Sequence, residues 1–187
     1  MLLARDRSDH RVARPIQIRG TRLAVLGVAA LVLQGCASFE PTIPVGYTGP
    51  TASISDHGFN ESTSKGQIFY VESIDGKPVQ TGSMLTQQAS NGQGFGLTLA
   101  YAQHPIPARP LRVKIVGTHI TGAPIQAIAS QIAGTFFKVE GEVNLNPVQG
   151  HQYFVTGKLA KDASKVWISD AEAESLPVTE VVESKPK

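Results

Sequence analysis

The side chains best suited to chemistry are one cysteine, Cys36, and four histidines that follow it: His57, His104, His119 and His151. Imidazoles act as general bases and metal ligands, and metal sites are signalled by histidines two or four residues apart or near available cysteines. None of these histidines has such a neighbour. Local spacing therefore predicts no metal site, no cofactor and no catalytic residues. The alternative is a site formed only in the fold, around His119 or around His57 with Asp56 beside it.

Other catalytic signatures are also missing. The sequence has no nucleophile elbow of the form G-x-S-x-G, and the glycine-rich stretch 91–96 lacks the spacing of a dinucleotide-binding loop. Glu140 and Glu142 are two apart in an alternating segment, so they share one face with Lys138. Paired carboxylates can perform acid/base catalysis when buried, but these three charges indicate a solvated strand face. We therefore expect a non-enzymatic protein.

Trp167 is the candidate ligand contact. It alternates with the apolar Val166 and Ile168, so in a strand its indole faces away from the core. An outward aromatic side chain is suited to binding a glycan or a protein partner. Packing at the edge of the core is the competing interpretation.

The chemistry of Cys36 is indicated by what precedes it. Six arginines are followed by eleven uncharged residues, 23–33, and then by Leu33-Gln34-Gly35-Cys36. As a helix, the uncharged run would be about 16 Å long, roughly half the ~30 Å hydrocarbon core of a bilayer. This length is typical of the apolar region of a signal peptide. An N-terminal anchor helix with an incidental cysteine is the alternative.

The tetrapeptide 33–36 resembles the lipobox of bacterial lipoproteins. The resemblance implies cleavage between Gly35 and Cys36, a diacylglycerol on the Cys36 Sγ atom and acylation of the new amine. Residues 1–35 are then a lipoprotein signal peptide, and the mature chain is attached to a membrane through its N-terminal lipid. Ala37 stands where an aspartate would resemble an inner-membrane retention signal, so we expect the outer membrane, facing the periplasm.

Charge and composition restrict the remaining partners. Removal of residues 1–35 takes away six arginines and two aspartates, so the formal net charge changes from +2 to −2. A near-neutral domain without a basic patch is not expected to bind nucleic acid. Another envelope protein or a glycan is the expected partner.

The elements that would position these residues are mostly strands. Residues 36–50 are rich in proline and glycine and predict a tether, whose extended reach is at most about 45–50 Å. Residues 51–180 predict an antiparallel β-sandwich of about seven strands, because apolar residues alternate with polar ones in short segments separated by turns. These segments lie near 52–54, 68–74, 95–99, 111–115, 137–145, 153–159 and 166–168. Residues 181–187 are expected to be a disordered tail.

One segment has a helical pattern. Ile125, Ile128, Ala129 and Ile132 fall on one face of a helix that starts near Pro124 and ends before Gly134. We expect a short helix packed on the sheet, with an extended apolar crossover as the alternative.

Several stretches resemble a known class of envelope module. Tyr70–Pro78 (YVESIDGKP) is similar to a hairpin of transthyretin-like, carboxypeptidase-regulatory-like β-sandwiches. The segments 137–143, 153–157 and 166–170 resemble the final strands of uncharacterised proteobacterial lipoproteins. The likeness covers roughly residues 49–180 and implies a β-sandwich without transferring any catalytic residue.

Overall fold

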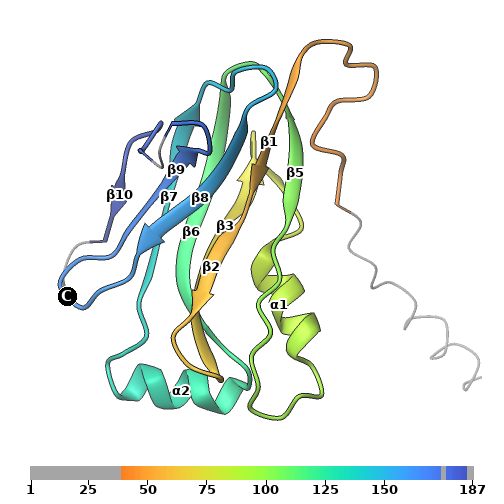
Figure 1. Ribbon diagram of the computed structural model, residues 1–187. Helices are drawn as coiled ribbons and strands as arrows, with labels where there is room; N and C mark the ends of the chain where they lie inside the picture. Colours follow the sequence, from red (N-terminus) through yellow and green to blue (C-terminus); the bar gives the residue numbers. More distant parts are fainter. Residues whose placement is uncertain (1–38, 174–175, 185–187) are drawn as a thin grey trace, which may run out of the picture. The chain divides into compact units, whose positions relative to one another are not determined.

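The computed structural model of the protein describes residues 39–173 and 176–184. The predicted signal peptide, its cleavage site at Gly35 and the predicted lipidation site Cys36 lie outside these residues. Ten strands and two helices are present in the described part of the chain (Figure 1). Their bounds are β1 Thr51–Ser55, β2 His57–Asn60, β3 Lys65–Ile74, β4 Lys77–Pro78, α1 Gly82–Ser90, β5 Gln103–Pro107, β6 Leu111–Thr121, α2 Pro124–Ile132, β7 Lys138–Leu145, β8 Gln152–Lys158, β9 Lys165–Asp170 and β10 Val182–Glu183.

The strands form two five-stranded sheets. Sheet A has the order β10-β9-β8-β1-β5, and sheet B has the order β2-β3-β6-β7 with β4 paired to β3. All pairings are antiparallel except β1 with β8, which is parallel. The two long central strands of sheet B, β3 and β6, are visible side by side in Figure 1.

The core lies between the two sheets. Ile54, Val155 and Ile168 of sheet A belong to the same buried cluster as Phe69 and Val113 of sheet B. Alternation places these residues inward because successive side chains of a strand point to opposite faces. The arrangement is therefore sandwich-like, with two sheets around one shared hydrophobic core.

The predicted mainly-β class is confirmed, and four details of the prediction are wrong. There are ten strands rather than about seven, because the sequence pattern did not predict β2, β4, β5 and β10. The sheets are not wholly antiparallel, because β1 pairs in parallel with β8. A second helix, α1, is also present, and the predicted strand at 95–99 does not form.

Helix α1 explains why residues 95–99 are not a strand. Its buried residues are small or polar and lie four positions apart: Gly82, Thr86 and Ser90. The Thr86 hydroxyl accepts a hydrogen bond from the Ala100 N–H (2.9 Å) and donates to the Ala100 carbonyl (3.1 Å). The Ser90 hydroxyl accepts from the Thr98 N–H (3.0 Å). Side chains of α1 thus satisfy backbone groups that a neighbouring strand would otherwise satisfy.

Helix α2 forms where the sequence predicts it, but its packing differs from the expectation. None of its residues is buried, and Ile125, Ile128 and Ile132 are 66%, 56% and 84% exposed. The outward side of β3 and β6 is already covered near Ile68 by α1 and by residues 97–99. Helix α2 therefore lies at the end of the sheets (Figure 1). No helix in the described part of the chain is both long and apolar enough to cross a bilayer.

The two ends of the described chain also differ from the expectation. Residues 39–50, the described part of the predicted tether, contact the sheets instead of extending away from them, and we name them the strap. The Thr42 hydroxyl donates a hydrogen bond to the Pro105 carbonyl, and the Ala108 N–H donates one to the Pro50 carbonyl. Within the predicted tail 181–187, Val182 and Glu183 form β10 against β9. Residues 185–187 lie outside the described residues.

Candidate functional site

Two of the predicted candidates lie near each other at the surface: Trp167 on the outer face of sheet A, and His57 on β2, an edge strand of sheet B. They line a shallow depression of about 490 Å³ with Ser55, Asp56, Phe154 and Thr156. We call the surface formed by His57, Phe154 and Trp167 the aromatic shelf. The ring centroids of His57 and Phe154 are 6.0 Å apart, and on its other side His57 stacks on Tyr101 at 6.5 Å.

Strand register builds this shelf. Parallel pairing aligns Ser55 with Phe154, and antiparallel pairing aligns Thr156 with Trp167. Trp167 points outward between the buried Val166 and Ile168, as the alternation predicts, and is partly exposed. Its indole N–H donates to the Ser169 hydroxyl at 3.0 Å, which holds the ring in one orientation. Flat rings beside hydroxyl groups can bind a ligand that has an apolar face and polar edges.

The carboxylate of Asp56 does not act together with His57. Its Oδ1 accepts the Val71 N–H (2.9 Å), and its Oδ2 accepts the N–H groups of Gly82 (2.6 Å) and Ala102 (3.4 Å). Burial raises the pKa of Asp56 to about 7, despite these three hydrogen bonds, each of which lowers it. The side chain thereby links three segments of the fold: β3, the first turn of α1 and the chain before β5.

His119 is buried and has both ring nitrogens occupied. Its Nδ1 accepts the Phe137 N–H (2.9 Å), so Nε2 carries the proton and donates to Glu61 Oε1 (3.1 Å). Gln67 donates to the same carboxylate (2.6 Å) and accepts from the Leu159 N–H. Burial lowers the pKa of His119, although Glu61 raises it. A neutral imidazole with no free lone pair is not placed to act as a general base.

His119 also borders a cleft of about 670 Å³, which lies between α1 and α2 on the outer side of sheet B. Its walls combine apolar groups such as Ile128 and Phe136 with hydroxyls and amides of Tyr70, Ser83 and Gln87. Burial raises the pKa of Tyr70 to about 12, so its phenol remains a neutral hydrogen-bonding group. Among the described residues that line this cleft, no nucleophilic side chain is hydrogen-bonded to a base.

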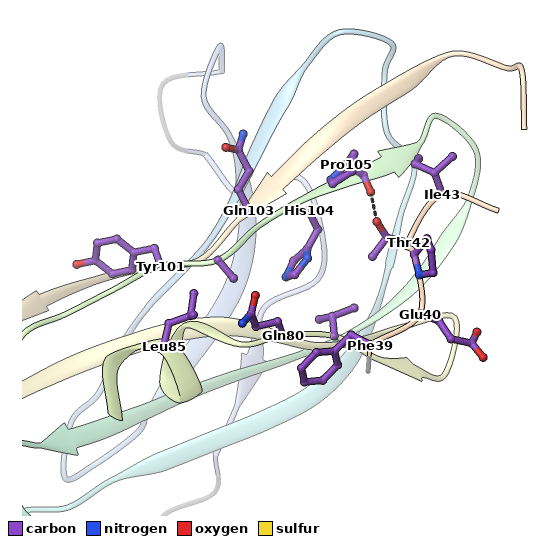
Figure 2. A pocket seen from close by; sticks show the side chains of 13 residues that line it. Phe39, Glu40, Thr42, Ile43, Gln80, Leu85, Tyr101, Gln103, His104 and Pro105 are labelled. Atoms are coloured by element: carbon purple, nitrogen blue, oxygen red, sulfur yellow. Dashed lines mark hydrogen bonds between the residues drawn. The ribbon is translucent and has the colours of Figure 1, made fainter. Parts of the chain in front are cut away.

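His104 lies under the strap. Figure 2 shows its ring between β5, Gln80 and the strap residues Phe39 and Thr42, at a pocket of about 500 Å³. Its Nε2 atom is buried without a hydrogen-bond partner among the described residues. Burial lowers the pKa of His104, so the imidazole is neutral.

His151 forms an ion pair with Asp170 that joins the start of β8 to the end of β9. The His151 Nδ1 and Asp170 Oδ2 atoms are 2.7 Å apart, and Glu172 Oε2 is 3.5 Å from Nε2. The hydrogen bond with Asp170 raises the pKa of His151. Burial raises the pKa of Asp170, but the bonds from His151 and from the Glu172 N–H outweigh it and lower the pKa overall.

This pair predicts a pH window of stability. The histidine's contribution is complete below its ordinary pKa of 6.5 and is lost as pH rises through the raised value in the folded protein. The aspartate's contribution is complete above 3.8 and is lost as pH falls through the lowered value. We expect His151→Gln to reduce the free energy of unfolding at pH 5 and to have little effect at pH 9, measured by urea unfolding. An equal loss at both pH values would contradict the prediction, and His57→Gln is the control.

The remaining predicted residues lie apart from these sites. Glu140 and Glu142 are exposed and pair with Lys138 (2.6 Å) and Arg112 (3.2 Å), so this strand face is solvated. Among residues 39–173 and 176–184, no group of three or more histidine, cysteine or acidic side chains could hold a metal ion. Sequence reasoning missed the structural role of Asp56, because its hydrogen-bond partners are distant in the sequence.

Comparison with known proteins adds no relative. No family model, no curated protein and no solved structure matches the chain. Any functional assignment therefore rests on the residues and geometry described above.

Proposed function

We propose that the protein is a bacterial envelope lipoprotein, anchored through lipid on Cys36, whose β-sandwich domain binds another envelope component without catalysing a reaction. The lipobox-like segment 33–36 supports the anchor, and the two-sheet fold is compatible with a transthyretin-like module. Two or three acyl chains give stable anchoring, because each buried CH₂ contributes about 0.8 kcal/mol. The expected location is the outer membrane, facing the periplasm.

The anchor is tested by replacing one atom. Cys36→Ser cannot carry a thioether-linked lipid, so cells that express it should yield protein without a radioactive palmitate label. Ser38→Ala is the matched control and should keep the label and the membrane fraction. If the Cys36→Ser protein still sediments with membranes while the original protein takes up no palmitate, the proposal is wrong.

For the binding activity we infer a glycan ligand at the aromatic shelf. The single observation that supports this choice is the grouping of Trp167, Phe154 and His57 beside the hydroxyls of Ser55 and Thr156. Sugar rings offer apolar faces to aromatic side chains and hydroxyls to polar groups at the rim. The buried or fully bonded state of Asp56 and His119 favours binding over catalysis.

Intrinsic fluorescence provides a direct test because Trp167 is the only tryptophan in the sequence. Envelope oligosaccharides are expected to change its emission, and Trp167→Ala should weaken their binding at least about tenfold, or ~1.4 kcal/mol, by calorimetry. Phe95→Ala is the control, since Phe95 is an exposed aromatic outside the shelf (63% exposed). Unchanged emission with every envelope glycan tested would contradict this ligand class.

The competing function is a metal-binding protein or enzyme with a site around His57 or His119. Elemental analysis of the purified protein distinguishes this function from glycan binding. A stoichiometric transition metal that is lost in His57→Ala or His119→Ala would favour the metal site.

A further inference from the structure

The strap is held against the body from its first described residues. Glu40 pairs with Lys77 (2.6 Å), and the Thr42 hydroxyl donates to the Pro105 carbonyl. Phe39 and Thr42 cover the pocket that contains His104 (Figure 2). These contacts place Phe39 close to β4 and β5.

Very little chain is left between this fixed point and the proposed anchor. Only Ala37 and Ser38 separate Phe39 from Cys36. Three Cα–Cα steps span at most about 11 Å. The polar layer on each side of a bilayer is roughly 5–8 Å thick. If Cys36 is lipidated, Phe39 must therefore lie at the headgroups or just outside them.

The surface around the strap is suited to such a position. Exposed apolar side chains include Phe39 (36% exposed) and Val45 (98%) of the strap, Tyr101 (45%), and Met84 on α1 (52%). Leu85, next to Met84, and Tyr101 both line the strap pocket. Amphipathic and aromatic side chains are favoured at the membrane interface. Transfer of an exposed valine side chain from water into lipid lowers its free energy.

Electrostatic attraction is not expected to hold this surface against a membrane. Lys77 and Arg109, which line a pocket beside the strap, are paired with Glu40 and with Asp75 (2.8 Å). The contact should therefore depend on apolar burial and the short connection, and it should change little with salt.

We propose that the face formed by the strap, Met84 and Tyr101 lies on the lipid bilayer that carries the anchor. This orientation rests on the proposed lipidation of Cys36. It places the β5 edge of sheet A next to the membrane and the β10 edge away from it, since these strands are at opposite ends of the sheet. Trp167 of the aromatic shelf, on β9 next to the β10 edge, then lies farther from the anchor's own membrane than His57, which stacks on Tyr101.

Spin labels on the lipidated full-length protein test the orientation. Cys36 is the only cysteine and would be acylated, so Met84→Cys, Val45→Cys and Val181→Cys each introduce one labelling site. Val181 is the matched control because it is also an exposed valine (38%), next to β10. On vesicles of phosphatidylethanolamine and phosphatidylglycerol, we expect accessibility to a water-soluble nickel chelate to be severalfold lower at positions 84 and 45 than at 181. An insertion of about 20 Gly and Ser residues after Ser38, with a root-mean-square span of roughly 25 Å, should abolish this difference.

Each contrary outcome has a distinct meaning. Equal accessibility at the three positions in protein with confirmed lipid would overturn the orientation alone. Persistence of the difference after the insertion would overturn the role of the short connection. Spin–spin broadening at position 84 would assign the face to a second copy of the chain and overturn the lipid contact. A lipid-free Cys36 peptide by mass spectrometry would overturn the anchor and, with it, this orientation.

Discussion

Asp56→Ala is expected to lower the free energy of unfolding by about 3–5 kcal/mol, because each buried backbone group left unpaired costs roughly 1–3 kcal/mol. The carboxylate of Asp56 is 5% exposed and accepts the N–H groups of Val71, Gly82 and Ala102. Alanine cannot accept a hydrogen bond, so the three N–H groups lose their acceptor. Urea unfolding followed by circular dichroism measures the loss.

Two further variants make this result interpretable. Asp56→Asn retains one acceptor oxygen but directs an NH₂ group at backbone donors, so its loss should be intermediate. Glu140→Ala removes an exposed carboxylate that pairs with Lys138, and exposed pairs contribute only about 0–1 kcal/mol. If Asp56→Ala were as stable as Glu140→Ala, Asp56 would not link the three segments as described.

The strands were predictable where apolar residues alternate and not where polar side chains perform the packing. β6 and β7 follow the alternation of Val113, Ile115, Val139 and Val143 closely, and the segments predicted there, 111–115 and 137–145, lie within these strands or overlap them. Helix α1 could not be predicted from the sequence, because its buried residues are Gly82, Thr86 and Ser90, which carry no apolar periodicity. Its hydroxyls bond to residues 98–100, and this is also why the alternating segment 95–99 forms no strand.

The candidate site was predictable only residue by residue. The outward direction of Trp167 follows from its place between Val166 and Ile168. Its proximity to His57 does not, because it depends on the parallel pairing of β1 with β8, strands almost a hundred residues apart. Such long-range register is set by the packing of the whole core, so local patterns carry no signal for it. For the same reason the contacts of the strap could not be read from its prolines and glycines.

Phe69→Ala is expected to have the other largest effect, a loss of about 3–5 kcal/mol in the free energy of unfolding. Phe69 is fully buried, and its ring occupies the space left by two glycines, one in each sheet. A Cβ atom on Gly117, its partner across the β3–β6 pair, would lie 2.8 Å from the Phe69 ring. A Cβ atom on Gly157 in β8 would lie 2.7 Å from the same ring. The ring therefore contacts both sheets, and its removal leaves a cavity at their interface. Phe95→Ala is the control and should change stability by less than about 0.5 kcal/mol.

A double-mutant cycle separates this packing from simple loss of apolar area. Gly117→Ala alone overpacks the ring and should cost about 1–3 kcal/mol. Phe69→Leu shortens the side chain and makes room for the added methyl group, so the double variant Gly117→Ala, Phe69→Leu should be more stable than the sum of the single losses by about 0.5–3 kcal/mol. Strictly additive losses would mean that residue 117 and the ring do not share the space between the sheets. A non-additive result would show that residue 117 is a glycine because the Phe69 ring occupies the space where its Cβ atom would lie.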